Sequence, residues 1–470
     1  MVFSYPKMVI PSYSEKLVEF VVDLSIKDVP DYVVEKTKDT VLDTLGCGIA
    51  GRGSDATKAA LNVIKELGGR AESSIIGVKE KTSCTNATFM NGIMSKCYDF
   101  DGGGAGGHSS PIMIPLALAL AERDNLSGKD VIEGIVTGVE VMGRVARALG
   151  PEHQVLHGFH TTATSGIFGA AAAAGKMLKL NKDQMTRALG IAGSCVSGTE
   201  AYLQDGAWTN CLHCAKPAAD GILSAMLAKN GFTGERWIFE GIDGILQVYS
   251  PRGTTEVDAL IDGLGSKWYV GERYTGYKWY SSCGSMHPSL DVFGKMMSEN
   301  QLNPDDIIEV SMWSNFHNYK FNCTPPQRKV APSSIVEGIF SMPFCLGMLA
   351  YKKEVTPFQW AEKGILNDPK ILSFAKKVNN LVWYDTIKPW YVKIDVKTKD
   401  GKVHSARSDP DRAHYSSPYT LEKLELKFNK NNSVTSLLSE DEVKTIFKLI
   451  RKLDKLTDIN DIVDILSKRK

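Results

Sequence analysis

Small side chains dominate one stretch of this sequence and limit how the chain can fold. Residues 167–175 read Ile-Phe-Gly-Ala-Ala-Ala-Ala-Ala-Gly, without a charge or a proline. Alanine has the highest helix propensity, and side chains this small let neighbouring backbones approach closely. We therefore expect a buried helix that packs tightly against other helices. At 470 residues the chain is long enough to bury a large core in two or more domains.

Further helices are expected on both sides of this stretch. Ser127 and Asp130 resemble a capping box, with Asp where Glu or Gln is usual, and a helical apolar spacing follows them. Three glycines on that helix favour close helix packing there: Gly134, Gly138 and Gly143. Residues 215–230 predict another helix, which Gly231 ends at its C-terminus.

The pattern changes at about residue 266, where strand signals begin. Aromatic or alternating segments predict β-structure at 267–270, 274–280, 307–313 and 391–397. Helical spacing is found at 288–298, 335–351, 421–428 and 439–453. We therefore predict a mainly α chain with a helical segment at 1–265, a smaller α+β domain at 266–400 and a second helical segment at 401–470. The last segment is expected to pack back on the first.

Charge and cysteine usage exclude several classes of protein. Lys plus Arg number 55 and Asp plus Glu 54, a balance that does not favour binding to nucleic acid or to an anionic membrane. Residues 1–14 do not resemble a signal peptide, and no apolar run is long enough to span a bilayer. Nine scattered cysteines fit reduced thiols better than a disulfide framework. We expect a cytoplasmic protein.

The first segment with chemical potential is the glycine-rich stretch at 98–111. It combines Asp99 and His108 with five glycines, and a helix is expected to follow. The two side chains are candidates for an acid–base pair, and loop amides such as that of Gly103 could hold an anion. The alternative is a flexible surface loop with a helix cap. The stretch is not a Walker loop, because no Gly-Lys-Ser/Thr follows the glycines.

A second segment, residues 157–165, places His160 directly before a run of hydroxyl side chains and the small-residue helix. A histidine at a buried helix start tends to stay neutral and can act as a base. The alternative is a structural cap made by Thr161 or Thr162.

A third segment reads Asn-Cys-Leu-His-Cys-Ala-Lys-Pro at 210–217. Cys211 and Cys214 have a spacing seen in metal and redox sites, but no second Cys/His pair completes a zinc site. Packing is the favoured explanation of these cysteines, and we predict no metal. His213 and Lys216 are the better candidates for contact with a ligand.

The fourth segment, residues 278–288, begins where the α+β domain is expected to start. Lys278 and His287 flank a turn of small residues there. Sites for small molecules are common at domain junctions, so both residues are candidates. The alternative is a linker with an incidental histidine.

In this order and spacing, the four segments resemble the MmgE/PrpD family, which includes 2-methylcitrate dehydratase, cis-aconitate decarboxylase and iminodisuccinate epimerase. Further marks of the resemblance lie at Asp43–Gly48, Gly138–Arg144, Gly231–Gly234, Phe340–Phe344 and Leu421–Phe428. It implies a helical domain made from both chain ends, an inserted α+β lid, a site between them, a homodimer, and no metal or organic cofactor. By position, the acid–base residues of the family match Asp99, His108, His160 and His287, and Lys278 matches a lysine before the lid histidine.

The sequence departs from the family pattern at three places. The usual His-Pro-Ser or His-Pro-Gly reads His108-Ser-Ser here. Glycines 102–104 replace a second acidic pair, and Asn210 stands where the family usually has a lysine facing the substrate. Losing that cation removes a contact to a carboxylate worth roughly 1.5–3 kcal/mol. Lys216, about one helical turn after His213, is the candidate to replace it.

These features predict a lyase that needs no cofactor and uses acid–base chemistry on a small polycarboxylate, with dehydration favoured. The alternatives are a decarboxylase or an epimerase on the same scaffold, an enzyme for a less charged metabolite, and a homologue that only binds a ligand. The predicted substrate-binding residues are Gly103, Asn210, His213, Lys216 and Lys278.

Overall fold

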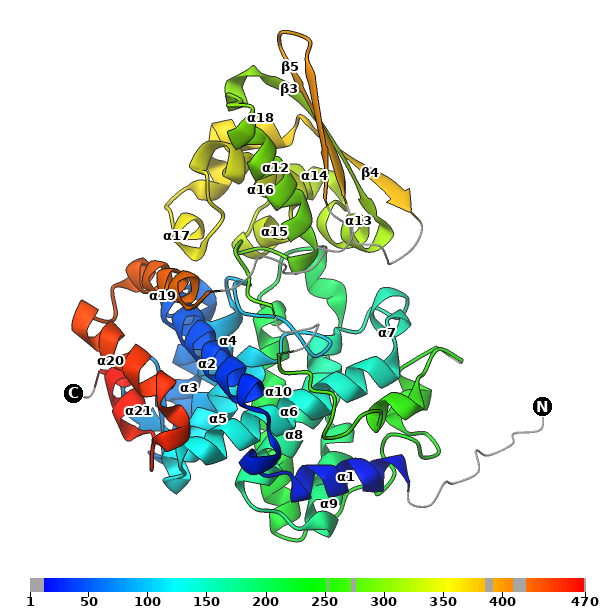
Figure 1. Cartoon of the computed structure of the whole chain (residues 1–470), viewed down its shortest axis with the longest axis vertical. Helices are drawn as coiled ribbons and strands as arrows, with labels where there is room; N and C mark the ends of the chain where they lie inside the picture. Colours follow the sequence, from blue (N-terminus) through cyan, green and yellow to red (C-terminus); the bar gives the residue numbers. More distant parts are fainter. Residues whose placement is uncertain (1–11, 252, 272–275, 385–391, 409–419, 469–470) are drawn as a thin grey trace.

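The computed structural model describes residues 12–251, 253–271, 276–384, 392–408 and 420–468. It has a large helical part and, above it in Figure 1, a smaller part that contains a four-stranded sheet. The fold is mainly α, as the sequence predicts. No described helix is long and apolar enough to cross a membrane.

The helical part begins with the first half of the chain and one short hairpin. Its helices are α1 (Tyr13–Asp23), η1 (Ile26–Asp28), α2 (Asp31–Gly51), α3 (Asp55–Leu67), α4 (Cys84–Lys96), α5 (Ser110–Asp124), α6 (Gly128–Leu149), α7 (Glu152–Val155), α8 (Thr161–Met177), α9 (Lys182–Gly193), η2 (Glu200–Leu203), α10 (Thr209–Lys229), α11 (Ile245–Val248) and η3 (Val257–Leu260). The hairpin is β1 (Ser73–Ile75) and β2 (Val78–Thr82).

The small-residue helix predicted at 167–175 is the buried centre of α8, which crosses α6 at close range. A Cβ atom added to Gly169 of α8 would lie 2.5 Å from the carbonyl oxygen of Gly138 in α6. The expected capping box at the start of α6 is present, since Ser127 and Asp130 each bond the other's backbone. The predicted close packing through Gly138 is confirmed.

The smaller part contains the elements η4 (Gly284–Met286), α12 (His287–Glu299), η5 (Pro304–Asp306), β3 (Ile307–Asn315), α13 (Phe316–Asn322), α14 (Pro326–Val330), α15 (Ile335–Ile339), α16 (Met342–Lys352), α17 (Pro357–Trp360), η6 (Ile365–Asn367), α18 (Pro369–Ala375), β4 (Val378–Tyr384), β5 (Lys393–Thr398) and β6 (Val403–Arg407). The strand order is β4-β3-β5-β6, with β4 parallel to β3 and the other pairs antiparallel. Buried residues of β3 and β5 pack on α12 and α16 in a second core.

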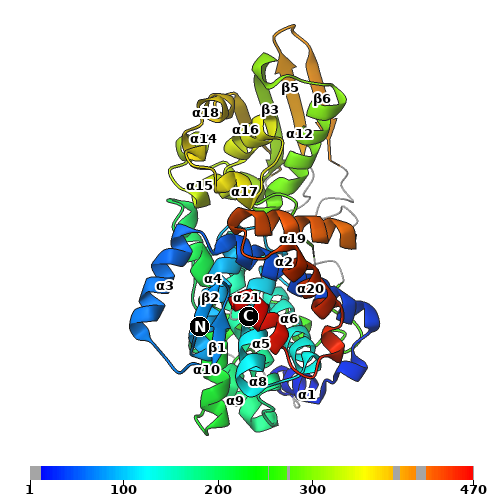
Figure 2. The same ribbon diagram turned by 90° about the vertical axis from the view of Figure 1, so that its left-hand side faces the viewer.

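The chain then returns to the helical part with α19 (Leu421–Thr435), α20 (Glu440–Arg451), η8 (Leu453–Lys455) and α21 (Asn460–Ser467). Figures 1 and 2 both show α19 lying along α2. Phe428 of α19 lies over Gly46 of α2, where an added Cβ would be 3.1 Å from the ring. Both chain ends therefore build the helical part, as expected.

Four local predictions differ from the structure. Residues 267–270 form a turn instead of a strand, because the Tyr269 N–H donates to the Glu140 carboxylate, 2.6 Å away, and not to a neighbouring strand. The single helix predicted at 335–351 is interrupted, and Ser341 caps the second piece. β6 lies beyond residue 400 and pairs with β5, so we place the end of the α+β domain after Arg407. Of the strand predicted at 274–280, residues 274 and 275 lie outside the described residues, and 276–280 form only an isolated bridge between Gly276 and Gly103. Residue 391 also lies outside the described residues.

Candidate active site

Two lysines and two aspartates form a buried charged cluster at the glycine-rich stretch. Lys96, the last residue of α4, forms ion pairs with Asp99 and, at 3.6 Å, with Asp101. Lys278 reaches the same cluster from the start of the α+β domain and donates to Asp99 Oδ2 at 2.6 Å. All four side chains are buried to at least 99%. Asp99 has a φ of 48°, a backbone conformation that costs energy for a residue other than glycine and is common at functional sites.

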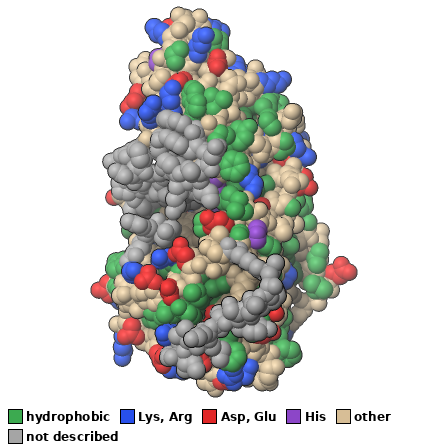
Figure 3. All heavy atoms as spheres, turned by 90° about the vertical axis from the view of Figure 1, so that its right-hand side faces the viewer, with side chains coloured by type: hydrophobic (Ala, Val, Ile, Leu, Met, Phe, Trp, Pro, Cys, Tyr) green, Lys and Arg blue, Asp and Glu red, His purple; other side chains and the backbone are tan. Residues whose placement is uncertain are grey.

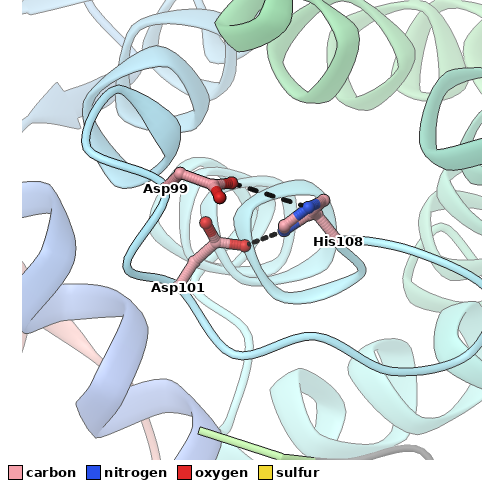
Figure 4. Close-up of side chains that lie close together, drawn as sticks. All are labelled: Asp99, Asp101 and His108. Carbon is pink, nitrogen blue, oxygen red and sulfur yellow. Dashed lines mark hydrogen bonds and ion pairs between the residues drawn. The ribbon is translucent and has the colours of Figure 1, made fainter. Parts of the chain in front are cut away.

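His108 lies against this cluster, with its ring facing both carboxylates (Figure 4). Its Nδ1 is 2.6 Å from Asp101 Oδ2, whereas its Nε2 is 3.6 Å from Asp99 Oδ1. The predicted Asp99–His108 pair is therefore corrected: Asp101 is the carboxylate that orients the imidazole, and Asp99 mainly binds the two lysines. Nδ1–H donates to Asp101, and the Lys96 ammonium lies 3.1 Å from Nε2.

The cluster keeps its charges despite burial. Burial alone would raise the pKa of both aspartates, but Lys278 and Lys96 at Asp99, and His108 and Lys96 at Asp101, lower it. The pKa of His108 is lowered, because burial and the two ammonium groups outweigh Asp101. The two carboxylates and two ammonium groups balance, and the imidazole is neutral.

A pair of histidines lies beside the cluster. His160 caps the start of α8 with its backbone, and its Nδ1 is 2.9 Å from Nδ1 of His213 on α10. Burial, together with His213 and His108, lowers the pKa of His160 well below 6.5, and burial and Lys96 lower that of His213 to about 4. The His160 and His108 rings are 6.4 Å apart. The structure thus confirms the expected burial of His160 at a helix start, and neither Thr161 nor Thr162 caps the helix.

This pairing fixes the protons of two neutral imidazoles. One Nδ1 must carry the proton that it donates, and the other must accept it. The donor's Nε2 is then bare, and the acceptor's Nε2 carries a proton. The pair therefore offers one basic nitrogen and one N–H donor at the same time.

Tyr202 and Glu200 extend the histidine pair, and the sequence analysis missed both. The ring of Tyr202, on η2, lies 5.6 Å from both the His160 ring and the His213 ring. Glu200 is a neighbour of the Tyr202 phenol, and burial raises the pKa of its carboxyl to about 7. Neither residue lies in a motif that would have marked it in the sequence.

His287 begins α12 on the other side of Lys278. Its Nε2 lies 3.1 Å from the carbonyl oxygen of Tyr280, to which it donates. Burial and Lys278 lower its pKa to about 3. Lys278 and Asp99 both influence this imidazole electrostatically, which places it at the edge of the charged cluster.

Two of the predicted substrate contacts, Gly103 and Lys216, are placed differently from expectation. The Gly103 N–H donates to the carbonyl of Gly276 at 3.0 Å, so it is not available to an anion. The Gly102 N–H is likewise bonded, to Asp43. Lys216 is about half exposed and pairs with Asp220 on the surface, so the structure does not bring it to His213. Asn210 is 2% exposed, and its Oδ1 has no hydrogen-bond partner among the described residues.

A metal ion has one group of potential ligands among the described residues: Asp99, Asp101 and His108, whose ligand atoms lie within 4.8 Å of one another. Lys96 and Lys278 already place two ammonium groups on these carboxylates. These two ammonium groups therefore supply the positive charge that a metal ion would supply to the carboxylates. Cys211 and Cys214 are buried thiols, and burial raises the pKa of each.

Comparison with known proteins identifies the family of the chain. The family model of the MmgE/PrpD N-terminal domain matches residues 15–258, and that of the C-terminal domain matches residues 280–455. The chain belongs to the MmgE/PrpD family. Its relatives include the cis-aconitate decarboxylase of Homo sapiens, 26% identical over 479 residues that cover 98% of this chain and 95% of the relative. The cis-aconitate decarboxylase of Aspergillus terreus (strain NIH 2624 / FGSC A1156) is 24% identical, with 95% and 94% covered.

Proposed function

We propose that this MmgE/PrpD protein is a lyase that acts on a small polycarboxylate by acid–base chemistry and releases carbon dioxide. The observation that carries the proposal is the His160–His213 pair, a buried base and N–H donor beside a cluster of ammonium groups. The relatives named as cis-aconitate decarboxylases support the choice of leaving group. They favour decarboxylation over the dehydration that the sequence analysis preferred.

The buried charged cluster and the histidine pair have separate roles in this reaction. Cleavage of the bond between carbon and a carboxylate leaves an electron pair on that carbon, which a neighbouring carboxylate can accept as an enolate. Lys278, with Lys96 behind it, is the cation available to stabilise that charge. The protonated Nε2 of the histidine pair then donates a proton to the carbon. One carboxylate and one proton are consumed, and carbon dioxide and the protonated product are formed.

Asn210 favours a second candidate, a substrate with fewer negative charges. It lies one helical turn before His213, so it shares a helix face with a site residue, and its buried carbonyl has no described partner. A carbonyl oxygen accepts a hydrogen bond from a hydroxyl or a protonated acid and does not attract a carboxylate. The same acid–base groups would then act on a mono- or dicarboxylic acid.

Proton NMR in heavy water tests the function. The purified protein is mixed in turn with cis-aconitate, citrate and a set of short mono- and dicarboxylic acids. Decarboxylation gives carbon dioxide and a product with one deuterium, dehydration gives water without carbon dioxide, and epimerisation gives deuterium exchange alone. We expect carbon dioxide release that His160→Gln reduces at least 100-fold. Binding without turnover of any compound would contradict the proposal and support a homologue that only binds a ligand.

The predicted homodimer and cytoplasmic location belong to the same proposal and rest on the family resemblance and the composition. Light scattering of the eluting protein tests the dimer directly, since a mass near 51.5 kDa would identify a monomer.

A further inference from the structure

Decarboxylation sets a requirement that the charged cluster does not meet. Each turnover replaces a carboxylate with a hydrogen, so one proton must enter the site from water. His160 is 5% exposed, and its pair with His213 is neutral. Lys96 holds its proton tightly, because the two aspartates raise the pKa of the ammonium despite its burial. The pair therefore needs a supply of protons that reaches it through the protein.

A line of side chains leads from the pair toward a cavity. Tyr202 lies against both histidine rings, and Glu200 is the neighbour of its phenol. Oε1 of Glu200 accepts a hydrogen bond from the Gln154 amide, whereas Oε2 is buried and accepts none from a described residue. Thr161, which follows His160, donates to Oε1 of Gln154 at 3.2 Å.

The cavity at the far end has a volume of about 650 Å³, and Gln154, Thr161 and Gly106 contribute to its wall. Charged side chains stand around it: Arg147 and Lys267 are 50% and 60% exposed, and Glu256 is 61% exposed. A cavity of this size with charged side chains in its wall can hold water. Figure 3 views the face of the molecule that lies on the right in Figure 1, where α7 is found. Histidine and acidic side chains reach the surface at mid-height of this face.

We propose that Glu200 and Tyr202 form a proton-supply route from this cavity to the His160–His213 pair. Once an Nε2–H has been given to the substrate, the Tyr202 hydroxyl gives its proton to that same Nε2 and takes the proton of the Glu200 carboxyl, and Glu200 then regains a proton from water that enters from the cavity on the side of Gln154. Glu200 acts through Tyr202 and is a positioning residue. This inference rests on the proposed decarboxylation, because dehydration consumes no net proton.

The titration of Glu200 supports this role. Its carboxyl, with a pKa of about 7, keeps a proton near neutral pH, whereas the histidines do not. The charged groups that face it from other elements are Lys96 on α4 and Lys320 on α13, and both lower the pKa that burial has raised. Lys320 donates to the carbonyl of Val155, 2.6 Å away, beside Gln154.

Two conservative variants test the route: Glu200→Gln keeps the shape of the side chain, and Tyr202→Phe keeps the ring. We expect the kcat of the wild type to fall as the pH rises through about 7, because Glu200 loses its proton. Each variant should lower kcat at least 10-fold near neutral pH, leave KM unchanged and abolish this step in the pH profile. The double variant should lose no more than either single one. Tyr249→Phe and Glu152→Gln are controls outside the route and should keep the wild-type profile. A wild-type profile in Glu200→Gln or Tyr202→Phe would overturn the proposal.

A measurement without substrate separates failure of the route from failure of the proposed function. In protein labelled with ¹⁵N-histidine, the ring signals of His160 and His213 should respond to the titration of Glu200 near pH 7. That response should vanish in Tyr202→Phe. If no carboxylic acid is decarboxylated but the response is present, the proposed function fails and the route stands. If the response is the same in Tyr202→Phe as in the wild type, the route is wrong.

Discussion

At the scale of single residues, Lys96 determines whether the buried carboxylates can stay ionised. It pairs with Asp99 and Asp101 and lies within 3.2 Å of both ring nitrogens of His108. Removing one partner of a buried ionic network leaves charges without compensation, which costs about 3–5 kcal/mol. We therefore predict that Lys96→Met lowers the free energy of unfolding by about that amount in urea titrations. The pKa of His108, followed by NMR, should rise in the variant, because Lys96 holds it down.

A matched control is Lys58→Met, since Lys58 pairs with Asp55 on the surface, where both side chains are more than half exposed. An exposed pair of this kind is worth at most about 1 kcal/mol. Equal stability of the two variants, with an unchanged pKa of His108, would show that Lys96 does not hold the cluster together.

The residues of this site differ in how far the sequence could reveal them. His160 could be found because the hydroxyl run and the small-residue helix after it are local signals. Lys278 was marked only as a candidate, since its partner Asp99 lies 179 positions away along the chain. Asp101 was passed over as the partner of His108, because residue spacing does not show which carboxylate the ring faces. Glu200 depends on burial by distant elements, which no local pattern encodes.

At the scale of helices and strands, the crossing of α6 and α8 sets the position of His160. Gly169 faces the backbone of α6 so closely that an added Cβ would lie 2.5 Å from the Gly138 carbonyl oxygen. We predict that Gly169→Ala destabilises the protein by about 1–3 kcal/mol, although alanine is the better helix former. Because His160 is the N-cap residue directly before α8, activity should fall as well.

The control for Gly169→Ala is Gly294→Ala in α12, where the nearest atom to the added Cβ is Leu349 Cδ2 at 3.4 Å. Contact at that distance is ordinary, so the variant should be unchanged or more stable by up to about 1 kcal/mol. Thermal unfolding of both variants decides the point: if Gly169→Ala unfolds at the wild-type temperature, the crossing is more tolerant than its geometry indicates.

Strand predictions failed where tertiary partners replaced a neighbouring strand. The alternation at 307–313 produced β3 because β4 and β5 lie on its two sides. The aromatic residues at 267–270 have a similar local pattern, yet they cover helices, and Glu140 takes the N–H that a strand would have paired. The hydrophobic periodicity and composition of a segment indicate which side chains are buried. They do not specify which groups will form hydrogen bonds with its backbone.

At the scale of the whole molecule, the buried histidines make the fold sensitive to acid. In the folded chain the pKa of His213 is about 4 and that of His287 about 3, while an unfolded histidine titrates near 6.5. Below about pH 6.5 the unfolded chain therefore binds protons that the folded chain does not, and stability falls as the pH drops toward 4. Glu140 and Glu200 act in the opposite direction, because folding raises their pKa to about 7.

The histidines outweigh these two glutamates, because four of them have a lowered pKa in the site alone: His108, His160, His213 and His287. We therefore predict that the free energy of unfolding, measured in urea, decreases between about pH 6.5 and 4.5, with each unit of pKa shift worth about 1.4 kcal/mol at most. His213→Gln removes one such group and should flatten the decrease, whereas His404→Gln changes a histidine at the periphery of the sheet and should leave it as it is. A decrease as steep in His213→Gln as in the wild type would mean that the acid sensitivity comes from elsewhere, and that the histidine pair takes up protons as readily in the folded chain as in the unfolded one.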